Sequence, residues 1–511
     1  MKAAGINIPR RRNPRILVVT PEITYLPQGM GNLANRLNAK AGGLADVSAS
    51  LVSALYELGA DVHVALPHYR RMFHIDVGKL ISEELRVYQS KLPDTRLHLA
   101  EDRIFYYRDT VYSGYDHDSR RIALAFQREV INNIIPLVKP DLIHCNDWMT
   151  GLIPGLARRL NIPCLFTIHN IHTQISTLAE IEDRGIDAAE FWPYLYYKWP
   201  PYNYESTRDS NPVDLLNSGI FSSHFINTVS PTFLKEVVDG KHAFVPGHIR
   251  NEIAGKYSAG CAEGILNAPD ESYNPETDPH LPVKFNVQSA IEGKRQNKLA
   301  FQKAVGLHED HDAPLFFWPS RLDPVQKGCQ LLSDILYGMI DKWWDQGIQV
   351  AFVANGAYQD VFHRIVAQHD FYGRVAVCDF SETLSRMGYA ASDFMLMPSL
   401  FEPCGLPQMT SAIYGSLPIV HDTGGLHDTV RHIDTIGKHG NGFVFENYDS
   451  GGLWWAVEQA MHFYNLPGEQ KNAMTQQIMQ ESLSNFNHKV TAKSYIDLYE
   501  RMLNRPLVGI F

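Results

Sequence analysis

Long apolar runs are missing from this chain of 511 residues. No stretch approaches the roughly 18 apolar residues that a membrane-spanning helix needs, and residues 1–14 lack the apolar core of a secretory signal peptide. The six cysteines are scattered, without the spacing of a metal site or a disulfide framework. We therefore expect a cytoplasmic protein with reduced thiols and no membrane partner.

Positive charge is also scarce. The chain has 46 Lys and Arg against 56 Asp and Glu, a formal net charge of -10, which argues against a nucleic-acid partner because such proteins present a basic surface. A content of 45% hydrophobic and 20% charged residues is that of an ordinary globular protein. The length exceeds what one hydrophobic core normally serves, so two large domains are expected.

Short apolar runs alternate with helix-like segments along almost the whole chain. This alternation predicts an α/β protein whose parallel sheets are covered by helices on both faces. The expected strands are Arg15–Thr20, Asp61–Leu66, Asp141–His144, Pro163–Ile168 and Phe225–Val229 in the first half, and Leu315–Trp318, Gln349–Val353, Arg374–Cys378, Phe394–Met397 and Leu417–Val420 in the second.

One segment interrupts the alternation. Residues 268–296 are rich in Pro, Asn, Asp and Glu and carry no long apolar run, which is typical of a connection between domains. We predict a first domain at 1–270, a linker at 271–294, a second domain at 295–480 and a C-terminal stretch at 481–511 that contains an amphipathic helix. Residues 186–214, dense in aromatics and prolines, are expected to form an irregular insertion.

Glu402 lies in a turn between the expected strand at 394–397 and a helix expected to begin near Gln408. Open α/β sheets bind ligands at the carboxyl ends of their strands, and a helix N-terminus there can hold an anion. Glu402 is therefore a candidate substrate contact, and the backbone N–H groups of Gly405 and Leu406 suit a phosphate or a sugar. Cys404 is either part of this site or a small buried thiol that packs the turn.

A second candidate turn contains Lys40 and the paired glycines Gly42 and Gly43, just before the first amphipathic helix. The glycines allow close approach of a ligand to the backbone, and the lysine adds a positive charge, so the turn suits a phosphate. A purely structural turn is the alternative. The pattern is neither a P-loop nor a dinucleotide fingerprint, which argues against an NTPase or a dehydrogenase.

These two turns resemble motifs of one enzyme family. KAGGLADV at 40–47 is similar to the KxGGLADV motif of the ADP-glucose-type bacterial glycogen synthases and plant starch synthases, and FEPCGL at 401–406 is a second specific match. Further matches follow in the family's order within residues 15–500: NDW at 146–148, TIHN at 167–170, TVSPT at 228–232, GILN at 264–267, GKxxNK at 293–298, SRL at 320–322 with QKG at 326–328, TGGLxDTV at 423–430 and GNGF at 440–443.

The resemblance implies a GT-B glycosyltransferase, with two Rossmann-like doubly wound domains facing a central cleft and a last helix that crosses back to the first domain. It implies a retaining hexosyltransferase that adds glucose from ADP-glucose to the non-reducing end of an α-1,4-glucan. The partners would be a nucleotide-sugar donor and an α-glucan acceptor. The sugar nucleotide is a substrate, and neither a cofactor nor a metal is expected.

The catalytic residues implied by the resemblance are Arg321, Lys327, Glu402, His169 and Asp147. Arg321 and Lys327 would stabilise the negative charge that grows on the departing nucleotide diphosphate. Glu402 and His169 would position the glucosyl unit, and we do not assign Glu402 as a covalent nucleophile. Asp147 would bind acceptor hydroxyls.

Two further residues complete the expected site. Trp148 would pack against a sugar, with a core tryptophan as the alternative, and Asn267 would face the donor, with an ordinary turn asparagine as the alternative. Lys40, Gly42 and Gly43 would serve the phosphates.

Three of the places where the chain departs from the family pattern bear on the site. Residues 28–38 are an extra segment that is either a lid hinged on its glycines or a longer surface loop. Leu400 replaces an arginine, and Pro407 removes one backbone N–H from the turn that contains Glu402. These departures motivate one alternative, a GT-B enzyme that uses UDP-glucose or a small sugar acceptor. A non-catalytic glucan-binding paralogue is the other alternative, although Glu402, Arg321 and Lys327 are all present.

Overall fold

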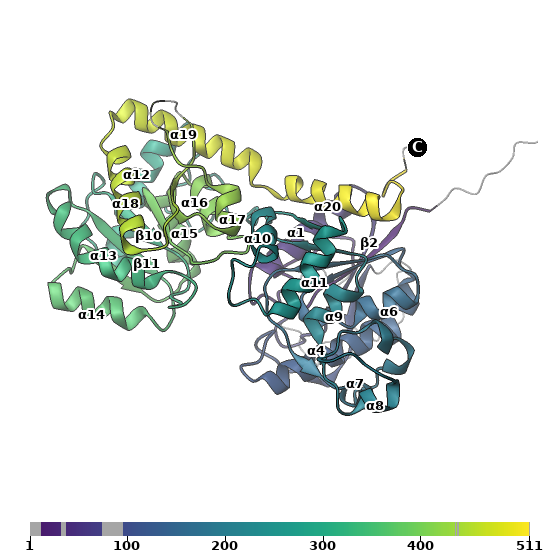
Figure 1. Ribbon diagram of the computed structural model, residues 1–511. Helices are drawn as coiled ribbons and strands as arrows, with labels where there is room; N and C mark the ends of the chain where they lie inside the picture. Colours follow the sequence, from purple (N-terminus) through teal and green to yellow (C-terminus); the bar gives the residue numbers. More distant parts are fainter. Residues whose placement is uncertain (1–11, 32–36, 74–95, 435, 437–438, 510–511) are drawn as a thin grey trace, which may run out of the picture. The chain divides into compact units, whose positions relative to one another are not determined.

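The computed structural model describes residues 12–31, 37–73, 96–434, 436 and 439–509 (Figure 1). The chain divides into two compact units. The N-terminal unit comprises Met1–Asn227, Phe244–Glu263 and Thr491–Phe511, and the C-terminal unit comprises Thr228–Ala243 and Gly264–Val490. The division predicted from the sequence, at residues 270, 294 and 480, consists of consecutive segments. In the structure, each unit instead combines segments that are separated along the chain.

The N-terminal unit is built on a seven-stranded sheet with the strand order β3-β2-β1-β4-β5-β8-β9. The pairs β1–β2, β1–β4, β2–β3 and β4–β5 are parallel, and β1, β4 and β5 are almost wholly buried. Buried parallel strands need helices on both faces. The strands are β1 (Arg15–Val19), β2 (Asp61–Pro67), β3 (Leu97–Ala100), β4 (Leu142–Asn146), β5 (Cys164–Ile168), β8 (Phe225–Thr228) and β9 (Ala262–Gly264).

Sequence signals mark the face and the end of the first helix of this unit. Helix α1 buries Leu44, Val47, Leu51 and Leu55 at helical spacing, and Gly59 follows it with a φ of 85°. The main helices are α1 (Gly43–Glu57), α4 (Asp116–Glu129), α6 (Ile153–Arg159), α7 (Leu178–Asp183), α8 (Tyr204–Arg208), α9 (Leu215–Ser222) and α11 (Gly247–Ser258). Shorter pieces are α3 (Arg103–Tyr106), the π-helix η2 (Val130–Ile134), α5 (Ile135–Val138) and the 3-10 turns η3 (Trp148–Thr150), η4 (Ala188–Glu190) and η5 (Trp192–Tyr194), with β6 (Ile175–Ser176) and β7 (Val213–Asp214) as a separate antiparallel pair.

The C-terminal unit has a six-stranded, all-parallel sheet with the order β12-β11-β10-β13-β14-β15. Numbered within the unit, this is the 3-2-1-4-5-6 order of a doubly wound dinucleotide-type fold. The strands are β10 (Leu315–Trp318), β11 (Gln349–Val353), β12 (Val375–Cys378), β13 (Phe394–Met397), β14 (Leu417–His421) and β15 (Phe443–Phe445).

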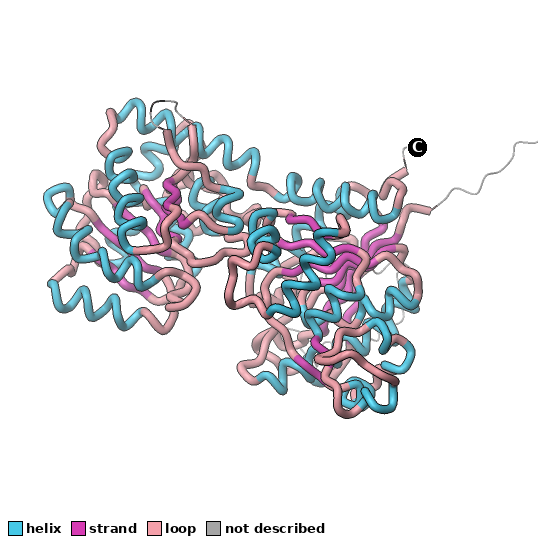
Figure 2. Tube along the Cα trace, viewed as in Figure 1, coloured by secondary structure: helices cyan, strands magenta, loops and turns pink. Residues whose placement is uncertain are grey.

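Both faces of this second sheet are buried by apolar packing. On β10, Phe316 and Trp318 belong to one hydrophobic cluster, while Leu315 and Phe317 belong to another. The strands therefore form the middle layer of the unit, with helices outside it (Figure 2). The helices are α10 (Pro231–Val238), α12 (Ala290–Val305), α13 (Cys329–Lys342), η6 (Trp344–Gln346), α14 (Gln359–His369), α15 (Glu382–Ala391), α16 (Pro407–Ile413), α17 (Gly424–Thr429), α18 (Ser450–Tyr464) and α19 (Gly468–Asn485).

The prediction of a doubly wound α/β protein is confirmed, and each strand expected from an apolar run is present. Helix α10 groups with the C-terminal unit because it packs on α17. Asp428 accepts hydrogen bonds from the hydroxyls of Ser230 and Thr232 at 2.5 and 2.6 Å, and Glu236 accepts the backbone N–H of Gly424 at 3.0 Å. Helix α12 begins at Ala290, so the last part of the predicted linker is helical.

The last helix, α20 (His488–Leu503), passes from one unit into the other in sequence, since residues from Thr491 onwards belong to the N-terminal unit. The Tyr499 hydroxyl lies 2.7 Å from Nδ1 of buried His144 on β4, and the Tyr495 hydroxyl accepts a hydrogen bond from Asn227 at 3.0 Å. The end of the chain is thus tied into the first sheet by buried polar contacts.

Among the residues that the structure describes, no helix combines the length and the apolar character needed to cross a membrane.

Candidate functional site

Several of the predicted site residues lie at the carboxyl ends of strands at, or next to, the point where the strand order of each sheet reverses. In the N-terminal unit this point lies between β1 and β4, and in the C-terminal unit between β10 and β13. Asp147 follows β4, Arg321 follows β10 and Glu402 follows β13, while His169 follows β5 beside β4. Ligands of doubly wound folds bind at this edge. Each unit therefore presents its own group of candidate residues.

In the C-terminal unit, Lys327 and Glu402 form a buried ion pair. The Lys327 Nζ lies 2.5 Å from Glu402 Oε2, and the two side chains are 11% and 9% exposed. The Ser399 hydroxyl donates to the same oxygen at 3.1 Å. Gly328 follows Lys327 and has a φ of 70°. A Cβ atom at Gly328 would lie 2.0 Å from the carbonyl oxygen of Pro398, so only glycine lets this part of the loop approach Pro398 closely enough to place Lys327 here. Oε2 of Glu402 is fully engaged, which leaves Oε1 for a ligand.

Arg321 differs from Lys327. It lies in the same loop after β10 but is exposed, and the described residues provide no ion-pair partner for its guanidinium. Buried and paired arginines are the usual structural kind, whereas an unpaired arginine at a ligand-binding edge is free to bind an anion bidentately. The sequence predicts the same role for Arg321 and Lys327, but the structure gives the two side chains different surroundings.

The turn that contains Glu402 is held from two sides. The backbone N–H of Gly425 donates to the Glu402 carbonyl at 2.9 Å, and the Gln408 side chain donates to the carbonyls of Cys404 and Gly405 at 3.0 Å. Pro407 is the first residue of α16, a position where the missing N–H has no partner within the helix in any case. Pro407 therefore fits this turn without the loss that its sequence position suggested.

Cys404 and Asn267 contact one another beside this turn. Cys404 is buried, and burial raises the pKa of its thiol to about 12, while the backbone of Asn267 hydrogen-bonds the sulfur. A neutral thiol is a poor nucleophile. The side-chain oxygen of Asn267 is buried and has no hydrogen-bond partner among the described residues. Such an atom carries a free-energy cost that a hydroxyl donor from a ligand would remove.

In the N-terminal unit, a buried carboxylate occupies the glycine turn. Glu22 Oε2 accepts the backbone N–H groups of Ala41 and Gly42 at 2.6 and 3.0 Å, and Oε1 accepts the Tyr112 hydroxyl at 3.0 Å. Burial raises the pKa of Glu22 despite these hydrogen bonds. The turn thus presents its N–H groups to an anionic group, as expected, but the group is a side chain of the protein itself.

Lys40 is also engaged. Its Nζ lies 2.8 Å from Asp46 Oδ2 on α1, and the Lys40 side chain is 43% exposed. The roles of Lys40, Gly42 and Gly43 as phosphate ligands stay predictions. Glu22 itself was not among the predicted site residues. The only sequence signal for it was its place directly after the first apolar strand.

Asp147 adopts a strained conformation. It has a φ of 56° and a ψ of 179°, which only glycine adopts readily. Its carboxylate accepts the backbone N–H of His169 at 2.8 Å, and burial raises its pKa to about 7. A backbone outlier and a raised pKa in one residue at a strand end mark a functional candidate.

His169 lies next to Asp147. Its Nε2 is 3.0 Å from Oδ1 of Asn146, and the Asn146 amide donates to the carbonyl of Val19. The oxygen of Asn146 must then accept, so His169 carries its proton on Nε2 and leaves Nδ1 as an acceptor. Burial lowers the pKa of His169 to about 3, so the ring is neutral.

Trp148 is almost fully buried and contacts the His172 ring edge-on at 5.6 Å. This placement agrees with the core alternative more than with an exposed sugar platform, although the sugar contact stays a prediction.

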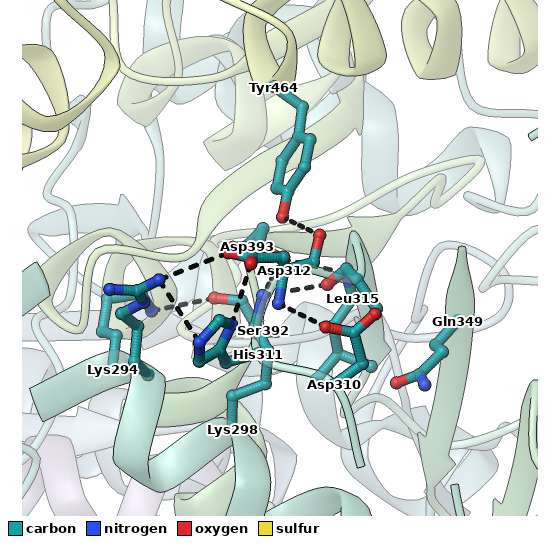
Figure 3. Close-up of polar contacts among 12 residues, drawn as sticks. Lys294, Lys298, Asp310, His311, Asp312, Leu315, Gln349, Ser392, Asp393 and Tyr464 are labelled. Atoms are coloured by element: carbon teal, nitrogen blue, oxygen red, sulfur yellow. Dashed lines mark hydrogen bonds and ion pairs between the residues drawn. The ribbon is translucent and has the colours of Figure 1, made fainter. Parts of the chain in front are cut away.

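The lysines of the GKxxNK motif have structural partners. Lys294 donates to the carbonyls of Ala390, Ser392 and Tyr414 at 2.8 to 3.1 Å. Lys298 pairs with Asp393 at 2.6 Å, and Figure 3 shows both lysines beside Ser392 and Asp393. Both lysines contact Ser392–Asp393, just before β13 and so at the opposite edge of the sheet from Glu402. They therefore stabilise the fold and belong to neither candidate group.

Three ligand-type side chains, Asp310, His311 and Asp312, lie close enough to share a cation. Arg295 already contacts His311 and Asp312 at 3.3 and 3.4 Å, however, and supplies the positive charge. We assign no metal role to them.

Known proteins resemble this chain in sequence and in fold. Residues 15–248 match the family model of the starch synthase catalytic domain. A glycogen synthase from Alkaliphilus metalliredigens is 31% identical over 91% of this chain and 97% of its own, and one from Exiguobacterium sibiricum is 33% identical over 90% and 95%. The solved catalytic domain of starch synthase IV from Arabidopsis thaliana, bound to ADP and acarbose, superposes with a TM-score of 0.75 at 26% identity and covers 97% of this chain and 100% of its own. A sucrose-phosphate synthase from Thermosynechococcus elongatus, at 16% identity and a TM-score of 0.57, shares the fold.

The chain has two doubly wound units with candidate residues at their strand ends, and its fold matches that of the solved starch synthase IV domain. These features define a glycosyltransferase of the GT-B class. Within that class the chain belongs to the glycogen and starch synthase family. It is a glucosyltransferase of the glycogen synthase type, acting with a nucleotide-sugar donor and a glucan acceptor.

Proposed function

We propose that the donor is ADP-glucose and that glucose is added, with retention of configuration, to the non-reducing end of an α-1,4-glucan. The observation that carries the proposal is the buried Lys327–Glu402 pair beside the unpaired Arg321 at the carboxyl edge of the second sheet. The choice of ADP is supported by the starch synthase IV structure, which is bound to ADP.

The two cations serve the leaving group. As the bond from the glucose C1 to the phosphate oxygen breaks, the electron pair stays with ADP and its negative charge grows. Arg321 and Lys327 stabilise this charge more than the ground state, which lowers the barrier. The acceptor hydroxyl forms the new bond to C1, and its proton leaves with the departing phosphate on the same face of the sugar.

Glu402 and His169 position the glucosyl unit. Glu402 Oε2 is held by Lys327 and Ser399, so the carboxylate is fixed in place and Oε1 accepts a sugar hydroxyl. Neutral His169 offers Nδ1 as an acceptor to another hydroxyl. Neither residue needs to form a covalent bond to glucose.

We further propose that the reaction needs no metal and no cofactor, because the two cations supply the charge that a divalent ion would otherwise provide. Turnover should therefore be the same in EDTA as in magnesium. A loss of turnover in EDTA that magnesium restores would contradict this part of the proposal.

The test of donor and acceptor is nucleotide release from ADP-glucose and UDP-glucose at matched concentrations, each with glycogen, with a short maltooligosaccharide and without acceptor. We expect ADP release that depends on either glucan. Preference for UDP-glucose, or transfer to a small sugar in place of glucan, would establish the alternative enzyme. Glucan binding without release from any donor would establish the non-catalytic paralogue.

A further inference from the structure

A cavity of about 310 Å³ lies at the edge of the second sheet opposite to Glu402. Its walls come from α12, from the residues just before β10, β13 and β14, from the end of α18 and from the start of α19. All of these elements belong to the C-terminal unit, so the cavity is complete within one unit. Small-molecule sites usually have volumes of about 300–1,000 Å³, so the cavity has room for a small ligand.

Positive charge exceeds negative charge in this cavity. Lys294 and Lys298, which Figure 3 shows beside Asp393, are deeply buried, at 8% and 3% exposure. Asp393 is already compensated, because its Oδ2 accepts the Lys298 Nζ at 2.6 Å and the backbone N–H of Leu315 at 2.9 Å. The name basic cavity is used here for the space lined by four cations beside two carboxylates: Lys294, Arg295, Lys298 and Lys471, with Asp312 and Asp393.

The cations of the basic cavity disfavour one another's charge. Burial and the nearby charge of Lys298 lower the pKa of Lys294 to about 7, and the same two causes lower the pKa of Lys471. An anion among these side chains would stabilise their charged forms, and the relief of this repulsion would strengthen its binding.

Several N–H groups in the cavity remain for a ligand. The Lys298 Nζ donates to the Ala313 carbonyl and to Asp393, so one of its three N–H groups has no partner among the described residues. The Lys471 Nζ donates to a single carbonyl oxygen in the described part of the chain, at 3.0 Å, and keeps two N–H groups. Lys294, by contrast, uses all three on carbonyl oxygens and contributes its charge alone. Ammonium groups of this kind suit the oxygens of a phosphate.

The start of α19 favours the same kind of ligand. Gly468, its first residue, lines the basic cavity, and no described side chain caps the helix there. The N-terminus of a helix carries a partial positive charge and N–H groups without partners in the helix, which attract an anion. Asn472, one turn later, also lines the cavity and adds an amide donor.

We propose that the basic cavity binds a small phosphorylated metabolite, at a site separate from the donor and the acceptor. A phosphate monoester carries a charge of about −1.5 to −2 at neutral pH, which matches the excess of cations over carboxylates. The phosphate lies among Arg295, Lys298 and Lys471, and the Tyr464 ring offers an apolar wall to the carbon skeleton. The cavity is lined by residues just before β13, whereas Glu402 follows that strand, so the ligand does not touch the reacting sugar.

The test uses the full chain saturated with both ADP and UDP, so that the donor site is occupied whichever nucleotide it prefers. Titration calorimetry then measures the binding of two probes, inorganic phosphate and glucose 1-phosphate. We expect one saturable site for each, with tighter binding of glucose 1-phosphate because its ring also packs on Tyr464. Tighter binding of inorganic phosphate would identify the free ion as the ligand and overturn the proposal of a metabolite. Absence of saturable binding, or binding only without the nucleotides, would overturn it too.

The variant Arg295→Gln/Lys471→Gln removes two cations of the cavity and keeps the length of both side chains. We expect it to bind glucose 1-phosphate at least about tenfold more weakly, the scale for losing one charge-assisted hydrogen bond. Its kcat in phosphate-free buffer should be unchanged. The matched control Lys303→Gln/Arg364→Gln removes the same charge from exposed positions of the same unit and should keep the wild-type affinity. Wild-type affinity in the first variant, or an equal loss in the control, would contradict the proposal.

Asn472→Asp gives a second test, which holds even where the double variant fails to fold. It adds a negative charge to the wall of the cavity and removes no hydrogen bond between described side chains, so binding of both probes should be lost. Asn485→Asp, at the exposed end of α19 and outside the cavity, is its control and should bind as the wild type does. Unaltered binding by Asn472→Asp would show that the probes bind elsewhere and would overturn the proposal.

Discussion

At the residue scale, the two cations after β10 differ in how much they matter for the stability of the folded protein. Lys327 is buried and compensated by Glu402, so removing either partner leaves an unpaired charge in the interior. Arg321 is exposed and unpaired, so its removal leaves the folded protein almost unchanged. A measurement of both stability and turnover distinguishes the two residues, although their proposed role in the reaction is the same.

We therefore predict that Arg321→Ala and Lys327→Ala each lower kcat by a factor of about 100 or more, the scale for losing one preorganised electrostatic group. Only Lys327→Ala should also lower the free energy of unfolding, by about 3 kcal/mol, because Glu402 loses its partner. Steady-state kinetics and urea unfolding check both effects. Arg364→Ala, an exposed arginine on α14, is the control and should change neither. Near-normal turnover in the Arg321 or Lys327 variant would remove that residue from the site.

The buried carboxyl of Asp147 predicts a pH dependence of stability. Its pKa is raised to about 7 from an ordinary value of 3.8. The protonated carboxyl therefore contributes fully to the free energy of unfolding below about pH 4, and this contribution is lost as the pH rises through about 7. Each tenfold difference in proton affinity between the folded and unfolded states corresponds to about 1.4 kcal/mol.

Asp147→Asn should remove this dependence, so that its melting temperature falls less than that of the wild type between pH 5 and pH 8. Thermal unfolding across this range measures the difference. The same slope in both proteins would show that Asp147 is ionised without cost in the folded state.

At the element scale, one glycine positions the end of a loop. Gly328 has a φ of 70°, and a side chain there would meet the Pro398 carbonyl at 2.0 Å. Gly328→Ala should therefore displace Lys327 from Glu402 and lower kcat strongly, in addition to the cost of about 1 kcal/mol for a left-handed alanine.

Gly306→Ala is the matched control, because Gly306 has a φ of 78° and open space around it. It should lower stability slightly and leave kcat unchanged. Equal kinetics for the two alanine variants would show that the close approach to Pro398 does not hold the site together.

Much of the element arrangement could be predicted from the sequence, for a physical reason. Buried parallel strands appear in the sequence as apolar runs, such as those at 315–318 and 394–397. Because parallel strands end at the same edge of a sheet, the side chains that follow these runs must lie at that edge. The sequence could not show that Glu22 occupies the glycine turn or that Glu402 neutralises Lys327. These partners lie 20 and 75 residues apart along the chain, and only the folded packing brings them together.

At the scale of the whole molecule, the chain returns to the N-terminal unit at its end. The Tyr499 hydroxyl contacts Nδ1 of His144, and Nε2 of His144 lies 2.6 Å from the Thr167 hydroxyl on the next strand. Both ring nitrogens of this buried histidine thus depend on partners, one of which comes from α20.

Tyr499→Phe should lower the free energy of unfolding by about 1–3 kcal/mol, because a buried nitrogen of His144 loses its hydrogen bond. The exposed Tyr257 of the same unit provides the control Tyr257→Phe, which should be neutral. Urea unfolding measures both, and indistinguishable curves for the two variants would show that the contact between Tyr499 and His144 adds nothing to stability.

The return of the chain also has a consequence for synthesis on the ribosome. The C-terminal unit has all of its residues once Val490 has emerged, whereas the N-terminal unit still lacks Thr491–Phe511. Nascent domains usually fold in the order in which they are made. Here the unit that is begun first is the last to be completed, so a message truncated near its end would yield a finished second unit attached to an unfinished first one.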